Sequence, residues 1–381
     1  MKKGKALRLT ALILCVVMLM TMLTACAKKE EPVKEDENTE ETEEKPNDFK
    51  TIYEYYPVDR PVMKIGDVEI NWGLFYFCFY QEVTKLNATN TVLDWTAEYG
   101  STGMSYIAYA ASEAIYNSLR RYAGIEHFSK EYGVTLTEEQ EAQYNADRES
   151  DVELFEGEDA MLEYMDSKFL DDSVAEYMAK SEYLYANLMD YVVGENGEKL
   201  EEDEILALAN TAYKMVKVIP FPISDEDGNP VGRDEKENQL ERAETCLAGL
   251  EGLSGQELSD SFDYEIGEYA EGNDDELMNG YVFARGKFDS AVEKAVKDIA
   301  EGELYDGVIE GSDNYYIAMR IPVDVEAYPY TIKTGFGDEN LRSLYKDDIF
   351  NNKFWDWADN AEVEFYPELT DVDINAIIAG V

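Results

Sequence analysis

Side chains that could act as nucleophiles, metal ligands or general bases near neutral pH are scarce in this sequence. Its 381 residues contain a single His, His127, and four Cys. One imidazole cannot build a multi-His metal site, which argues against the usual zinc hydrolase centres. The acidic stretch from Ser224 to Asp234 lacks the ligand spacing of an EF-hand calcium loop. We therefore expect neither a metal nor another cofactor.

The four cysteines fall into two groups. Cys15 and Cys26 lie within and just after an apolar N-terminal run. The other two, Cys78 and Cys246, could form a disulfide only if the fold brought them together. The simpler interpretation is two buried free thiols. His127 lies beside the apolar stripe of a long expected helix, and we interpret it as a structural residue rather than a catalyst.

The composition restricts the classes of partner. Lys and Arg number 33 against 82 Asp and Glu, which gives a formal net charge of -49. Such a chain repels phosphate backbones, so we expect no nucleic-acid binding. Attachment to an anionic membrane would need an anchor. The hydrophobic content of 45%, with 28 Tyr, predicts folded domains, and the length allows two or three of them.

The N-terminus has the pattern of an export signal. Basic residues within the first eight positions precede an apolar run from Ala11 to Leu23, which is short for a membrane span. The run ends in the letters LTAC, which resemble the lipobox of bacterial lipoproteins and imply that Cys26 is lipidated. An ordinary signal peptide followed by a chance Cys is the alternative. We expect residues 1–25 to be the signal and residues 26–52 to be an acidic disordered tether.

From Tyr53 onward the pattern predicts a folded, mainly helical region. Residues 62–70 alternate like a small hairpin. The segment 72–86 is apolar on nearly every face and predicts a central helix. Thr137 and Gln140 form a capping box at the start of a later helix. The apolar stripes predict helices over 105–132, 138–154, 157–168, 172–193 and 201–211.

A second pattern, strands mixed with helices, runs from about Lys214 to Pro322. Strands are expected over 214–221, 280–283, 304–310 and 315–321. Helices are expected over 235–250, 255–262 and 288–299. The acidic stretch 263–279 is expected to be a loop. An amphipathic helix over 337–361 and a strand over 363–365 follow.

The order and wording of residues 280–321 resemble the second half of a parvulin-type peptidyl-prolyl isomerase domain. That family typically reads G-Y-F-x-R-G, an apolar helix, G-E-[IL]-S-x-x-[VI] and G-Y-H-I-I-[KR]. The matching positions are Gly280, Tyr281, Arg285, Gly286, Gly302, Glu303, Val308, Tyr315 and Ile317. The resemblance implies a domain of about four antiparallel strands with helices over residues 212–324.

The same resemblance implies a polar centre of two His with a Cys or Asp, beside an apolar pocket. The corresponding positions carry no His: they are Ile219 or Pro220 in the first strand, Glu271 or Gly272 near the Cys or Asp position, and Tyr316 in the last strand. The pocket positions are Phe288 and Val292. A Tyr316 hydroxyl could replace one His as a hydrogen-bond donor, but not the pair. The candidate substrate contacts are Ile219, Phe283, Phe288, Val292 and Tyr316, of which Tyr316 is the candidate catalytic residue.

The helical region resembles the N-terminal chaperone module of PrsA/SurA-like extracytoplasmic foldases. The matching positions are Val62, Ile65, Gly66, Ile70, Lys130, Gly133, Val134, Thr135, Leu136 and Glu138. The resemblance implies an α+β protein with a discontinuous, mostly helical chaperone domain, formed by residues 53–211 and a C-terminal helix within 325–381. The parvulin-like domain would be inserted between these two parts. It further implies a lipid-anchored protein on the extracytoplasmic face of a Gram-positive cell membrane.

Three functions follow from these patterns. The first is a foldase-type chaperone that binds unfolded secreted proteins and has little or no prolyl isomerase activity. The second is a working isomerase with an altered centre at Tyr316. The third is a lipoprotein that binds a solute or an envelope partner. The sequence does not decide whether two chains form a homodimer by exchanging their C-terminal helices.

Overall fold

The computed structural model describes residues 56–90, 92, 94–225, 227–270 and 275–370. The predicted signal, Cys26, the tether and the Glu271 or Gly272 position lie outside these residues. The described part mixes helices with small antiparallel sheets, as predicted. The chain divides into two compact units: a helical unit up to Tyr191 and again from Asn352 onward, and a sheet unit from Val192 to Asn351. No helix within the described residues is both long and apolar enough to cross a membrane.

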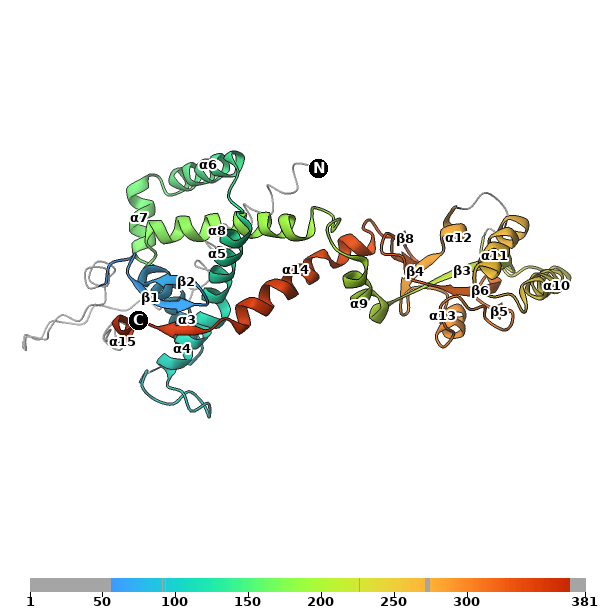
Figure 1. Cartoon of the computed structure of the whole chain (residues 1–381), viewed down its shortest axis with the longest axis horizontal. Helices are drawn as coiled ribbons and strands as arrows, with labels where there is room; N and C mark the ends of the chain where they lie inside the picture. The colour runs from blue at the N-terminus through green and yellow to red at the C-terminus, as the bar shows by residue number, and fades with distance from the viewer. Residues whose placement is uncertain (1–55, 91, 93, 226, 271–274, 371–381) are drawn as a thin grey trace, which may run out of the picture. The chain divides into compact units, whose positions relative to one another are not determined.

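The helical unit contains a three-stranded sheet and a set of helices (Figure 1). A π turn interrupts the long helix predicted over 105–132, which is otherwise continuous. Thr137 and Gln140 form the predicted capping box. The elements are β1 Pro61–Ile65, β2 Val68–Asn71, α3 Trp72–Asn90, α4 Tyr106–Ala114, η2 Ile115–Leu119, α5 Arg120–Tyr132, α6 Glu138–Leu154, α7 Glu158–Asp166, α8 Asp172–Val193, β9 Val363–Phe365 and α15 Pro367–Thr370.

The C-terminal strand completes the sheet of the helical unit. The strand order is β2-β1-β9, and Met63 of β1 lies opposite Phe365 of β9. Helix α3 lies against this sheet and supplies much of the core through rings such as Trp72, Phe75 and Phe79. Burial of these rings is the main source of stability here, at about 25 cal/mol for each Å² of apolar surface removed from water.

The end of helix α14, Leu341–Asn360, packs on α5 within the helical unit. The ring of Phe354 lies over Gly124, where an added Cβ would come 2.7 Å from Cζ of the ring. The Arg120 guanidinium donates to the carbonyl oxygens of Ala358 and Ala361. His127 stacks on Trp357, with ring centroids 4.2 Å apart. His127 is therefore a packing residue in this unit, as its position in the sequence indicated.

The sheet unit is built on a four-stranded antiparallel sheet of order β4-β3-β6-β5 (Figure 1). A short hairpin follows it, in which β7 and β8 have two residues each. The elements are α9 Glu202–Ala212, β3 Tyr213–Pro222, α10 Arg233–Leu250, α11 Gly255–Tyr269, α12 Asp275–Asn279, β4 Tyr281–Ala284, α13 Ser290–Val296, β5 Ile309–Glu310, β6 Asn314–Ile321, β7 Tyr330–Thr331, β8 Gly335–Phe336 and the first part of α14.

The register of β3 with β6 assigns each side chain to one of two faces. Residues directly opposite each other in an antiparallel pair share a face. Ile219 lies opposite Ile317, whereas Pro220 lies opposite Tyr316. The face of Ile219 is covered by α10 and α11, since Lys217 on that face binds Asp263 of α11. The other face is covered by α13 (Figure 1).

Two expectations about the sheet unit were wrong. The acidic stretch 263–279 is mainly helical where it is described, because α11 continues to Tyr269 and α12 spans Asp275–Asn279. Ile266 prolongs the buried stripe of α11, and this apolar periodicity outweighs the local acidity. The strand expected over 304–310 is reduced to β5 and one bridge from Leu304 to Met319. Gly307, with φ 148°, interrupts it.

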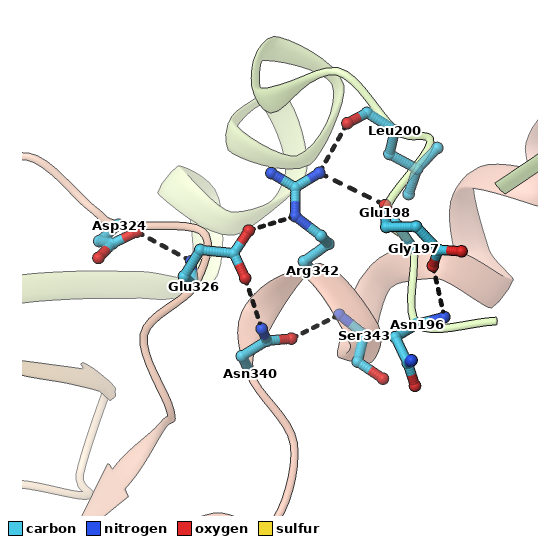
Figure 2. Close-up of polar contacts among 9 residues, drawn as sticks. All are labelled: Asn196, Gly197, Glu198, Leu200, Asp324, Glu326, Asn340, Arg342 and Ser343. Carbon is cyan, nitrogen blue, oxygen red and sulfur yellow. Dashed lines mark hydrogen bonds and ion pairs between the residues drawn. The ribbon is translucent and has the colours of Figure 1, made fainter. Parts of the chain in front are cut away.

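Arg342, at the start of α14, joins two connections of the sheet unit (Figure 2). Its guanidinium donates to the carbonyl oxygens of Leu200, at 2.6 Å, and Gly197, at 3.4 Å. It also forms an ion pair with Glu326, whose second carboxylate oxygen accepts from Asn340 at 2.8 Å. Arg342 therefore ties the segment before α9 to the segment before α14.

The Gly124 contact predicts a steric test of the helical unit. Gly124→Ala should lower the free energy of unfolding by about 1–3 kcal/mol, because the new methyl group meets the Phe354 ring. The same substitution should cost less in a Phe354→Leu background, where the ring is absent. All four Trp belong to this unit, so denaturant unfolding followed by Trp fluorescence reports it selectively. Equal costs in both backgrounds would contradict the contact.

The Arg342 contacts predict a second loss of stability, in the sheet unit. Arg342→Ala should destabilise the unit by about 1–3 kcal/mol, because the side chain is only 13% exposed and leaves carbonyl acceptors unpaired. Hydrogen exchange of residues 194–203 should accelerate. Arg233→Ala is the matched control, since Arg233 is 88% exposed and its ion pair within the described part of the chain is with Glu237 of its own helix. The same effect from both substitutions would refute the role of Arg342.

Candidate functional site

Tyr316 occupies the α13 face of the four-stranded sheet. It lies between Pro220 of β3 and Ile309 of β5 and is partly exposed. Its hydroxyl accepts a hydrogen bond from the Asn314 side chain at 3.0 Å. Burial raises the pKa of Tyr316 to about 12. The side chain is therefore a neutral phenol near pH 7, able to donate a hydrogen bond but not to act as a base.

A buried carboxylate, Asp289, fixes the surroundings of Tyr316. It caps α13 by accepting from the backbone N–H of Ala291 at 2.8 Å, and it also accepts from the N–H of Ser312 at 3.1 Å. Gly311 packs against both groups, since a Cβ there would lie 2.6 Å from Cε2 of Tyr316 and 2.8 Å from Oδ2 of Asp289. The carboxylate is thus committed to structure and is not placed to accept a proton from a substrate.

Five rings form an aromatic patch on the same side of the unit as Tyr316. Phe288 stacks on Phe283 with ring centroids 4.8 Å apart and lies 5.5 Å from Tyr330. Tyr330 also contacts Tyr281, at 4.9 Å. Except for the buried Phe283, the rings are partly exposed. The aromatic patch consists of Tyr281, Phe283, Phe288, Tyr330 and Phe336.

The structure separates the predicted contact residues into three groups. Phe288 and Tyr316 are partly exposed on the α13 face. Phe283 and Val292 are buried beneath that surface and support it. Ile219 needs correction: it is fully buried on the opposite face, under α10 and α11, because the register turns it away from Tyr316.

Of the two alternatives for the first-strand position, Pro220 is the one that neighbours Tyr316. Its ring has no ionisable group and cannot stand in for an imidazole. The chain's one His belongs to the helical unit, so the sheet unit has no imidazole. Cys246 in α10 is a buried free thiol, as is Cys78 in α3, and burial raises the pKa of each to about 12. The α13 face therefore offers apolar contact and a phenol hydrogen bond rather than acid–base chemistry.

Other candidate chemistry in the described residues is weak. They contain no group of three or more His, Cys, Asp and Glu side chains placed to hold a metal ion. The hollow beside Arg342, of about 660 Å³, is lined mainly by polar groups. Several of them already bind one another: Glu326 accepts from Arg342 and Asn340, and Glu198 accepts from the N–H of Asn196 (Figure 2). The polar groups that line this hollow therefore hold segments of the sheet unit together.

Sequence reasoning did not name four residues of the site as contacts: Asp289, Tyr281, Tyr330 and Phe336. Asp289 directly precedes Ser290, the first residue of α13, and an Asp before an apolar helix is a recognisable N-cap signal. Tyr330 and Phe336 flank a turn with Gly335 at φ 78°, which is a hairpin signal. Both signals are short, and the resemblance to an isomerase domain ended before the hairpin.

No family profile matches the chain, and no curated protein matches it. Several solved structures do. A SurA-like chaperone from Campylobacter jejuni is 13% identical, with a TM-score of 0.23, and the match covers 62% of this chain and 86% of that one. The foldase PrsA from Streptococcus pneumoniae is 13% identical, with a TM-score of 0.20 and coverages of 69% and 87%. PrsA from Bacillus cereus is 12% identical, with a TM-score of 0.20 and coverages of 70% and 86%.

The chain is similar to solved SurA-like chaperones and PrsA foldases, the kind of protein that the sequence resemblance indicated.

Proposed function

We propose that this chain is an extracytoplasmic chaperone of the foldase type that binds unfolded secreted proteins and has little or no prolyl isomerase activity. The observation that carries the proposal is the aromatic patch beside a neutral Tyr316, on a sheet unit without an imidazole. Clustered rings present large apolar area with few rotatable bonds, which suits weak binding to many apolar client segments.

The charge of the chain supports the same function. A net charge of -49 keeps complexes with apolar clients soluble through mutual repulsion. We further propose a lipid anchor at Cys26 and an acidic tether over 26–52, which would hold the folded part away from the membrane. The arrangement that we propose is the one implied by the resemblance: residues 53–211 and 325–381 form one helical domain, and residues 212–324 are inserted in it. The two compact units divide the chain at other residues, after Tyr191 and after Asn351.

A working isomerase with an altered centre is the second candidate, because the Tyr316 hydroxyl lies on the face where the resemblance places the substrate. Prolyl isomerisation must cross an amide-rotation barrier of about 18–20 kcal/mol. Catalysis requires polar groups that favour the twisted amide over the planar one. One phenol that already binds Asn314 is a poor substitute for two imidazoles.

Aggregation of a denatured client tests the chaperone function. The double substitution Phe288→Ala with Tyr330→Ala should require about ten times more protein for the same suppression, because loss of roughly 1.4 kcal/mol of apolar contact is a tenfold change. Tyr264→Ala is the matched control: Tyr264 is a 65% exposed ring of the same unit, outside the aromatic patch. Unchanged suppression by the double variant would remove the patch from the mechanism, and no suppression by the parent chain would end the proposal.

An isomerisation assay on a proline-containing tetrapeptide tests the prediction that the chain has little or no prolyl isomerase activity. Uncatalysed exchange takes tens to hundreds of seconds, and micromolar protein should leave that rate at background. Tyr316→Phe should not change the rate, and it should leave aggregation suppression intact. A clear acceleration that disappears in Tyr316→Phe would instead establish the altered centre.

A further inference from the structure

The helical unit contains an apolar cavity of about 220 Å³ that the proposed function has not used. Helices α6, α7 and α8 form most of its wall, with α3 and α5 behind them. The lining is rich in Met and aromatic side chains, including Phe155, Met161, Met165 and Met178. Apolar cavities of about 150 Å³ bind benzene. This cavity is therefore large enough for one bulky apolar side chain, and flexible Met walls adapt to its shape.

The rim of the cavity is negatively charged. Asp147 and Asp151 lie one turn apart on α6, and Asp147 accepts hydrogen bonds from Gln143 and Tyr183. Glu176 of α8 also lines the cavity, but it is paired with Lys180 at 2.9 Å. Arg148, also at the rim, is held by Asp172 through two hydrogen bonds of 2.6 and 2.9 Å. The cation on Arg148 is thus already matched by a carboxylate.

Asp151 is a carboxylate of the cavity lining that has no ion-pair partner among the described residues. Within the described residues it also forms no side-chain hydrogen bond. Partial burial and the neighbouring charge of Asp147 raise its pKa, and Arg148 offsets this only in part. A cation supplied from outside would relieve both effects.

Helix α6 is a solvent-exposed wall of the cavity. None of its residues is buried, and Leu154 near the cavity is 66% exposed. The helix is held to α8 mainly by polar contacts, namely Arg148 with Asp172, Gln140 with Asn187 and Glu141 with Lys180.

We propose that this cavity binds a bulky apolar side chain of an unfolded client segment in which Lys or Arg stands next to that side chain. The inference rests on the proposed chaperone function and names the kind of segment selected. The apolar walls take the side chain, and the carboxylates of Asp147 and Asp151 take the adjacent cation. Charge complementarity between the acidic rim and a basic flank identifies the occupant.

Three short fluorescein-labelled peptides test the selection by fluorescence anisotropy with the full chain. The first carries a Leu-Phe core with Lys on both sides, the second has Glu in place of Lys, and the third has Ser in place of the core. The first should bind at least ten times more tightly than each of the others. Equal binding of the Glu-flanked peptide, or of the Ser peptide, would overturn the proposal.

Variants of the cavity identify the site of binding. Ala179→Phe and Ala175→Leu each fill the cavity from α8 and should weaken binding of the Lys-flanked peptide at least tenfold. Asp151→Asn should weaken it about three- to tenfold, whereas Glu149→Gln, an exposed charge on the same helix outside the cavity, should not. Far-UV circular dichroism verifies folding of each variant. Full binding by a folded cavity-filling variant would refute the site.

The outcome separates this inference from the chaperone function. If the variants lose the peptide but still suppress aggregation, the cavity is a selective site and other surfaces hold the client. If the parent chain binds the peptide and suppresses no aggregation, the site stands and the chaperone function fails. If the parent chain binds none of the peptides, the inference fails whatever the aggregation assay shows.

Discussion

The pairing of β3 with β6 determines what the sheet unit can present to a partner. Side chains alternate between faces along a strand, so a shift of one residue would exchange the two surfaces completely. The observed register places Tyr316 beside Pro220 and under α13, whereas Ile219 is enclosed beneath α10 and α11. The aromatic patch depends on this choice, because Phe283 reaches the same face through its pairing with Lys214 of β3. The backbone hydrogen bonds at the centre of the sheet thus determine which side chains form the apolar surface.

The two units use aromatic residues in different ways. In the helical unit the rings of α3 are buried and supply cohesion. In the sheet unit the rings of the patch stack on one another and keep part of their surface in water. The cavity bounded by α6, α7 and α8 is intermediate, since it is apolar inside and acidic at its rim. These differences in exposure, rather than the aromatic content itself, indicate which surfaces could receive a client.

Much of the fold could be predicted where a helix carries a continuous apolar stripe or a clear cap. The helix over 172–193 and the capping box of Thr137 and Gln140 are examples. The site was harder for a physical reason: β3 is buried on both faces, so alternation could not decide between Ile219 and Pro220. The cavity of the helical unit could not be predicted either. Its walls come from separate helices, and no short sequence pattern indicates that these helices pack around a common cavity.

The position of β9 has a consequence for the order in which the chain can be completed. Met63 pairs with Phe365, so the small sheet of the helical unit obtains its last strand from the far end of the polypeptide. During synthesis the N-terminal helices emerge first, but the edge of β1 stays unpaired until the whole sheet unit has followed. A chain that ends before Val363 therefore leaves the backbone N–H and C=O groups along this edge of β1 without a partner strand.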